Sequence, residues 1–125
     1  MIFLDTHVVA WLYEKELNRF PDTVLTYLDT EDLRVSPLVL LELAYLHEIG
    51  RLLSTSGDVF AYLESAMGLT EDRSPFSAVS ARARELTWTR DPFDRIIVAQ
   101  ADINSAPLVT KDQEILIHYE NGLWE

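Results

Sequence analysis

Short, continuously apolar runs alternate along the chain with segments in which apolar residues recur every three or four positions. The run at 1–4 ends at Asp5 and predicts a buried strand that delivers an acid at its carboxyl end. From Thr6 the spacing becomes helical, and after a break at 18–22 a second helix carries its apolar stripe at 24–28. Further strands are expected at 33–35, 69–72, 107–110 and 123–124, and further helices at 58–67 and 113–118.

Three more helices are predicted from their first residues. Ser36-Pro37, Ser74-Pro75 and Asp91-Pro92 each place a side-chain acceptor before a proline, the arrangement of N-cap and first helical residue. The helices that follow are expected at 37–49, 75–87 and 92–104.

Short apolar strands alternating with helices indicate an α/β fold, a three-layer α/β/α sandwich around a mostly parallel central sheet. At 125 residues the chain is long enough to bury one core, and its 48% hydrophobic composition is that of a globular protein. No repeat or linker interrupts it, so residues 1–125 are expected to form a single domain.

Composition limits the function classes. A formal net charge of −11 argues against broad, non-specific binding of nucleic acid, although five bases gather between residues 82 and 111. The absence of cysteine excludes disulfides and thiolate metal sites. No signal peptide is recognised and no run approaches the roughly 20 apolar residues of a membrane span, so we expect a cytoplasmic protein.

Four acids stand where surface residues are not expected. Asp5 and Asp112 follow predicted strands, and ligands of doubly wound sheets bind at the carboxyl ends of the strands; a turn or capping role is the alternative for each. Glu42 has apolar residues at i−4, i−3, i+3 and i+4, so it is expected to face the core; a salt bridge to a distant arginine or a partly exposed edge position is the alternative. Asp94 shares a helix face with Ile97, with a capping-box role as its alternative.

Two neighbours of Asp94 are assigned different roles. Asp91 is expected to cap its helix. Arg95 is expected to pair with Asp91 at i+4, in preference to contacting a substrate phosphate.

Four inward-facing carboxylates would repel one another unless a cation joined them, so their convergence implies a metal ion. Oxygen ligands point to Mg²⁺, with Mn²⁺ as an alternative. Such a centre can position a phosphodiester, lower the pKa of water for in-line attack and neutralise the leaving oxygen. The expected chemistry is that of a nuclease.

Four stretches of the chain resemble the PIN-domain family, and within it the VapC-type toxins of type II toxin-antitoxin modules. They span nearly the whole sequence, and the Asp-Pro-Phe-Asp-Arg block is the most specific part. The stretches are Leu-Asp-Thr-His-Val-Val-Ala-Trp-Leu (4–12), Ser-Pro-Leu-Val-Leu-Leu-Glu-Leu (36–43), Arg-Asp-Pro-Phe-Asp-Arg-Ile-Ile-Val-Ala-Gln-Ala (90–101) and Leu-Val-Thr-Lys-Asp (108–112).

The resemblance implies a PIN-like fold and a Mg²⁺-dependent endoribonuclease that cleaves RNA, forms a homodimer and is inhibited by a cognate antitoxin. The family's catalytic metal ligands fall on Asp5, Glu42, Asp94 and Asp112. Thr6 and Thr110 match the hydroxyl positions beside them, where ordinary turn chemistry is the alternative role. Arg95 and Lys111 are the candidates for substrate binding.

Two rival functions remain open at this point. A non-catalytic PIN-fold module would bind a protein partner. The presence of all four acids argues against it, because a module without catalysis would be free to lose them. Phosphoryl transfer through an aspartyl intermediate needs a second acid close to Asp5, where Thr6 and His7 stand instead. The three histidines share no metal-ligand spacing and are not expected to act in catalysis, the tryptophans are expected to pack, and residues 57–72 are expected to shape RNA choice.

Overall fold

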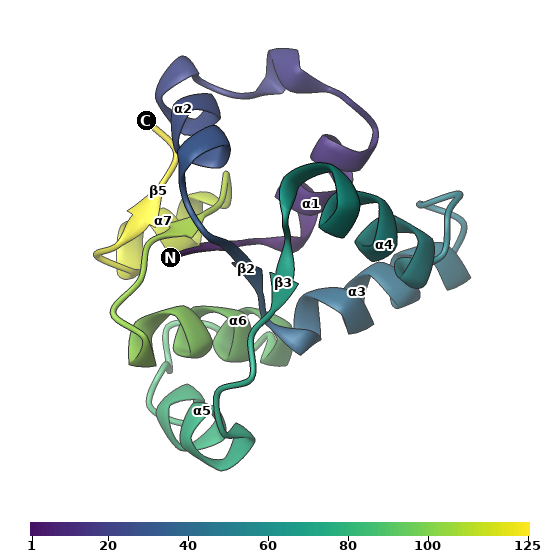
Figure 1. Cartoon of the computed structure of the whole chain (residues 1–125). Coiled ribbons are helices and arrows are strands. Elements are labelled where there is room, and N and C mark those ends of the chain that lie inside the picture. The colour runs from purple at the N-terminus through teal and green to yellow at the C-terminus, as the bar shows by residue number, and fades with distance from the viewer.

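Five short strands form one fully parallel sheet in the order β3-β2-β1-β4-β5. The computed structural model describes all 125 residues, and its strands are seen in Figure 1. They are β1 (Ile2–Leu4), β2 (Leu33–Val35), β3 (Thr70–Glu71), β4 (Leu108–Val109) and β5 (Gly122–Leu123). All five expected strands are present, and the last lies one residue earlier than predicted.

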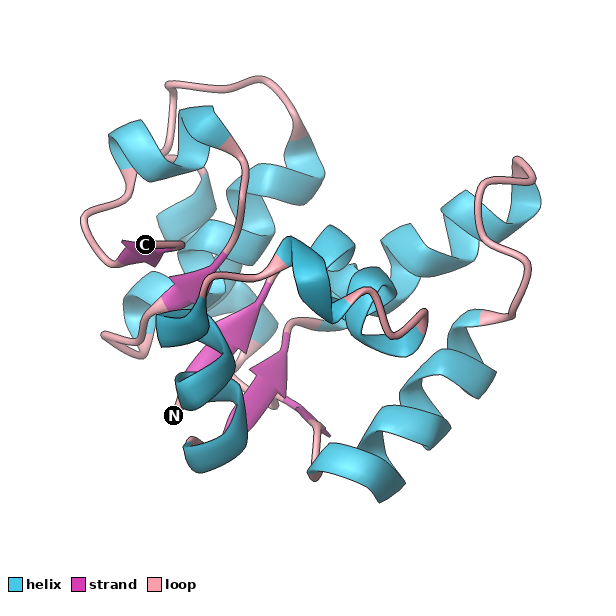
Figure 2. Ribbon diagram, turned by 90° about the horizontal axis from the view of Figure 1, so that it is seen from above, coloured by secondary structure: helices cyan, strands magenta, loops and turns pink.

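Helices connect every pair of consecutive strands and lie on both sides of the sheet (Figure 2). The three-layer α/β/α prediction is therefore confirmed. No helix has the length and apolar composition needed to span a membrane. The helices are α1 (Thr6–Tyr13), α2 (Asp22–Thr30), α3 (Pro37–Glu48), α4 (Ser56–Met67), α5 (Phe76–Ala83), α6 (Pro92–Ile103) and α7 (Gln113–His118), with a 3₁₀ turn at Leu17–Arg19.

The strand order reverses between β1 and β4. The chain runs outward from β1 to β3, then returns to the other side of β1 to form β4 and β5. Because parallel crossovers are right-handed, the helices before and after this reversal fall on opposite faces of the sheet. The crevice at the carboxyl ends of β1 and β4 is thus the expected ligand site of such a fold.

Two of the three predicted helix starts are confirmed. The Ser36 hydroxyl accepts a hydrogen bond from the Leu38 amide at 3.1 Å, and the Asp91 carboxylate accepts one from the Phe93 amide at 2.9 Å. The third helix, α5, begins one residue later than predicted and lacks the expected cap. The Ser74 hydroxyl donates to Asp72 at 2.5 Å, and its oxygen accepts the side-chain amide of Asn104 at 2.9 Å in place of a helix amide.

Helix α5 also ends four residues earlier than predicted, at Ala83. Beyond it the backbone changes to tighter i+3 hydrogen bonds, from the amide of Glu85 to the carbonyl of Arg82 and from the amide of Leu86 to the carbonyl of Ala83. This turn buries Leu86 in the core.

A buried acid at the end of β3 was not anticipated. Asp72 is 4% exposed and accepts hydrogen bonds from Gln100 at 2.8 Å, from Arg34 at 3.2 Å and from both donors of Ser74. Burial opposes ionisation of Asp72, but these hydrogen bonds outweigh it and lower its pKa. The network ties α6 to β2 and β3, so this carboxylate is a structural element.

Candidate active site

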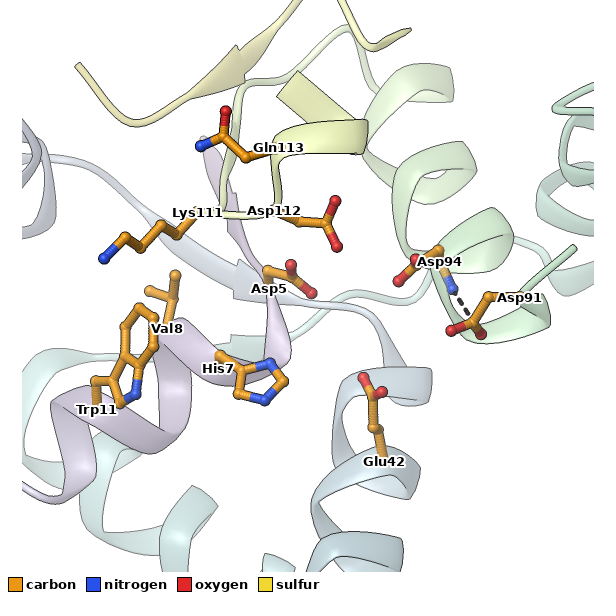
Figure 3. A pocket seen from close by; sticks show the side chains of 10 residues that line it. All are labelled: Asp5, His7, Val8, Trp11, Glu42, Asp91, Asp94, Lys111, Asp112 and Gln113. Atoms are coloured by element: carbon orange, nitrogen blue, oxygen red, sulfur yellow. Dashed lines mark hydrogen bonds between the residues drawn. The ribbon is translucent and has the colours of Figure 1, made fainter. Parts of the chain in front are cut away.

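A cavity of about 480 Å³ opens at the carboxyl edge of the sheet, beside the ends of β1 and β4 (Figure 3). Ten residues line it: Asp5, His7, Val8, Trp11, Glu42, Asp91, Asp94, Lys111, Asp112 and Gln113. All four acids predicted to bind metal are among them. We call this space the carboxylate cavity.

Asp5 lies at the base of the cavity, where β1 passes into α1, and is 8% exposed. One carboxylate oxygen accepts the Thr6 amide at 2.8 Å and the other accepts the Thr110 hydroxyl at 2.6 Å. The Thr110 hydroxyl oxygen in turn accepts the Asp112 amide at 3.0 Å. Burial raises the pKa of Asp5, with Asp112 adding to the rise and these hydrogen bonds opposing it.

Glu42 reaches the cavity from α3 and is half-buried. The Thr6 hydroxyl donates a short hydrogen bond to one of its carboxylate oxygens. Burial raises the pKa of Glu42, as do the negative charges of Asp5 and Asp91. The expectation that Glu42 faces the core is only partly correct, since Glu42 is half-buried and Tyr45, on the same side of α3, is 51% exposed.

Asp94 and Asp91 both come from the start of α6, and Figure 3 shows them on the same side of the cavity. Asp91 caps the helix, as predicted, yet it also lines the cavity as a fifth carboxylate. Burial, followed by the charges of Asp91, Asp5, Asp112 and Glu42, raises the pKa of Asp94 to about 7. Every carboxylate of the cavity therefore acts electrostatically on Asp94.

Asp112 differs from its prediction because it lines the cavity but is exposed, where a buried acid was expected. It is the N-cap of α7, and one oxygen accepts the amides of Glu114 and Ile115 at 2.9 and 3.1 Å. The capping role considered as the alternative is thus real. The other oxygen accepts no hydrogen bond from the protein, so Asp112 can cap α7 and still present a free ligand atom to the cavity.

The two candidate substrate residues are placed differently. Lys111 lines the carboxylate cavity and lies 6.0 Å from the centre of the Trp11 ring. Arg95 lies outside it, and its expected ion pair with Asp91 is absent. Instead its Nε donates to the carbonyl of Thr89 at 2.8 Å, while Asp91 turns toward the amides that it caps.

Sequence reasoning missed several lining residues. Asp91 had a usable signal, since it precedes Asp94 by three positions and residues at i and i+3 share a helix face. His7 also had one, because it lies in the first turn of the helix that follows Asp5. Trp11 was expected only to pack; it does contact Phe20 and Trp124, but part of it faces the cavity.

The carboxylates share the cavity without reaching ligand spacing, since no three His, Asp or Glu side chains stand close enough to hold one ion as they are placed. Five like charges repel one another, which favours this spread arrangement. These acids nonetheless offer only oxygen donors, and the pKa values of Asp5, Glu42 and Asp94 are raised by burial and then by the neighbouring negative charges. The donor chemistry suits Mg²⁺ or Mn²⁺.

Comparison with known proteins identifies both a family and related folds. The family model described as PIN domain matches residues 2–120. No curated protein sequence gives a significant match.

Three solved structures resemble the chain over nearly its whole length. The crystal structure of VapBC2 from Rickettsia felis bound to a DNA fragment from their promoter matches with a TM-score of 0.67 and 19% identity, covering 100% of this chain and 98% of that one. DNA-bound VapBC from Salmonella typhimurium matches with a TM-score of 0.62 and 17% identity, covering 97% of this chain and 95% of that one. FitAcB from Neisseria gonorrhoeae matches with a TM-score of 0.57 and 21% identity, covering 100% of this chain and 97% of that one. At these identities the likeness establishes the fold.

Proposed function

This chain belongs to the PIN-domain family, and from that premise we propose that it is a Mg²⁺-dependent endoribonuclease that hydrolyses RNA phosphodiester bonds in the carboxylate cavity. One observation carries the proposal. Asp5, Glu42, Asp94 and Asp112 come from four separate segments of the chain, and the fold brings all four to one cavity.

The two threonines support this assignment by holding the acids in place. Thr6 donates its amide to Asp5 and its hydroxyl to Glu42, and Thr110 donates its hydroxyl to Asp5. Both threonines are fully buried, so their hydroxyls have few alternative orientations. We propose that they position the carboxylates that hold the metal.

A divalent ion held by these acids would supply Lewis acidity and balance the charge that builds on the phosphate. The chain's own residues bind and orient the RNA. Lys111 is the only lysine or arginine that lines the cavity, so we assign it to a non-bridging phosphate oxygen. Trp11 and Val8 exclude water from the wall beside it.

The net charge of −11 requires an explanation in an RNA-cleaving protein. Much of the local negative charge belongs to the cavity itself, and it is neutralised there when a cation binds. Affinity for RNA is then expected to depend on the metal, with little binding in its absence.

We further propose that the protein is the toxin of a toxin-antitoxin pair, bound by a cognate antitoxin and acting as a homodimer. The likeness to chains of VapBC complexes supports a protein partner. So does an exposed apolar surface on α3, α4 and the loop between them. That surface contains Leu41, Tyr45, Ile49, Leu53 and Tyr62, which are 42–95% exposed.

The decisive experiment compares purified wild type with Asp94→Asn and Asp5→Asn on RNA with Mg²⁺ or Mn²⁺. Each substitution is expected to reduce cleavage by about 100-fold or more. Asp58→Asn, which neutralises an exposed acid on α4, is the matched control and should leave cleavage unchanged. If wild type neither cleaves RNA nor binds either metal, the proposal is wrong.

Expression in cells separates the toxin from a non-catalytic binding module. The toxin predicts growth arrest that is relieved by the neighbouring open reading frame and lost in Asp94→Asn. Growth arrest that persists in this variant would favour the module.

A further inference from the structure

A second hollow of about 140 Å³ lies between α5 and α6, and two arginines face it. Its lining consists of Ser80, Ala83, Arg84, Pro92, Arg95 and Ile96. We call it the arginine hollow. Nothing in the site described above uses it.

Neither of these two arginines is neutralised by an ion pair. Arg19, Arg34 and Arg82 form ion pairs with carboxylates, whereas Arg84 and Arg95 form none. The nearby acids are engaged elsewhere. Glu85 pairs with Arg82, Asp91 caps α6, and Asp94 lines the carboxylate cavity. The arginine hollow is therefore a local positive site on a strongly acidic protein.

The guanidinium group of Arg95 is also positioned for an anion. The Nε of Arg95 donates to the carbonyl of Thr89 at 2.8 Å, which fixes the group and leaves its two terminal nitrogens without hydrogen bonds in the protein. Arg84 follows the last residue of α5 as its C-cap, and its side chain forms no hydrogen bond. A planar guanidinium that presents two donors matches the oxygens of a phosphate.

Helix α6 links this hollow to the carboxylate cavity. Asp94 and Arg95 are consecutive residues, so their Cα atoms are about 3.8 Å apart, and their side chains diverge by about 100° around the helix. Asp94 faces the carboxylate cavity and Arg95 faces the arginine hollow. A strand that crosses the first turn of α6 would meet both.

We propose that the arginine hollow binds a backbone phosphate of the RNA strand next to the one that is cleaved. The inference rests on the proposed ribonuclease function and adds a substrate subsite to it. A phosphate here would anchor RNA close to the acids by charge and shape, without reading sequence.

The test measures steady-state cleavage of a single-stranded RNA oligonucleotide with Mn²⁺ by Arg84→Gln, Arg95→Gln and Arg51→Gln. Arg51 is the matched control, because it is exposed, forms no ion pair and lies in the loop after α3. Arg84→Gln and Arg95→Gln should each raise KM by about three- to tenfold with kcat unchanged, since a contact present in both ground and transition states is lost. The slope of log(kcat/KM) against log[salt] should fall in magnitude by about 0.7 for each arginine.

Arg84→Gln is the cleaner variant, because the Arg84 side chain forms no bond that the fold could lose. If wild type cleaves and Arg84→Gln matches Arg51→Gln in KM and salt slope, the inference is wrong while the proposed function stands. A loss of binding to a protein partner with RNA kinetics unchanged would also overturn it and assign the hollow to that partner. If wild type does not cleave RNA, the proposed function fails and this inference fails with it.

Discussion

The hydroxyl of Thr110 donates to Asp5 at 2.6 Å, joining residues that are 105 positions apart in the sequence. The same oxygen accepts the amide of Asp112 at 3.0 Å. One buried side chain thus connects the end of β1 to the turn that carries another acid of the cavity. Its position sets the relative placement of Asp5 and Asp112.

This relationship predicts that Thr110→Val weakens metal binding by about 10- to 100-fold, because Asp5 loses a hydrogen bond that favours its charged form. The Asp112 amide also loses its acceptor, at a cost of about 1–3 kcal/mol in the free energy of unfolding. Mn²⁺ titration by calorimetry measures the affinity. Thr110→Ser keeps the hydroxyl and should remain close to wild type; equal affinity of the Val and Ser variants would contradict the positioning role.

The raised pKa of Asp94 makes the stability of the metal-free protein depend on pH. Its pKa is raised from 3.8 to about 7 in the folded state, so between these values the folded state binds more protons than the unfolded state. Its contribution to the free energy of unfolding therefore falls as the pH rises from about 4 to 7. Above pH 7 Asp94 is ionised in the folded state, and the full cost of that buried charge lowers the stability.

Asp94→Asn removes that penalty. The variant should be more stable than wild type by about 2 kcal/mol at pH 8, after discounting for partial solvation, and the gap should shrink at pH 5. Urea denaturation with a chelator at both pH values measures this. A variant less stable than wild type at pH 8 would show that Asp94 is held by favourable contacts.

Binding of a divalent ion should offset the repulsion among the carboxylates of the cavity. At pH 8 a saturating divalent ion is expected to stabilise the folded protein by about 2.7 kcal/mol at a concentration 100 times its Kd. The effect should weaken at pH 5.5, where protons compete with the metal for Asp94, whose pKa is raised to about 7. Thermal unfolding in MnCl₂ and in KCl at equal ionic strength measures this effect. Equal shifts of the unfolding temperature in the two salts would exclude a specific metal site.

Asp72 provides a contrasting prediction, because it is an acid with a structural role. Asp72→Ala leaves Gln100 and Arg34 without their carboxylate partner and should lower the free energy of unfolding by about 3 kcal/mol. Glu71→Gln, at the exposed neighbouring position, should change it by less than about 0.5 kcal/mol. Chemical denaturation measures both, and a small effect of Asp72→Ala would mean that water replaces the network.

Much of the fold follows from local sequence. The apolar runs before Asp5 and Thr110 form strands because they are fully buried, and Ser36 and Asp91 begin helices because their side chains satisfy the first amides. These signals extend over a few residues and do not depend on distant contacts. The Ser74 cap prediction failed because α6 packs nearby: the Ser74 hydroxyl donates to the buried Asp72 and accepts the side-chain amide of Asn104.

The sequence by itself determined which acids to consider and that strand ends and helix faces would present them. Only the tertiary structure decided that Asp91 joins the cavity, that Asp112 lies exposed as a helix cap, and that Arg95 faces a different hollow. The physical reason is that local periodicity sets the side of an element on which a residue stands. The packing of elements distant in sequence then sets what lies opposite that side.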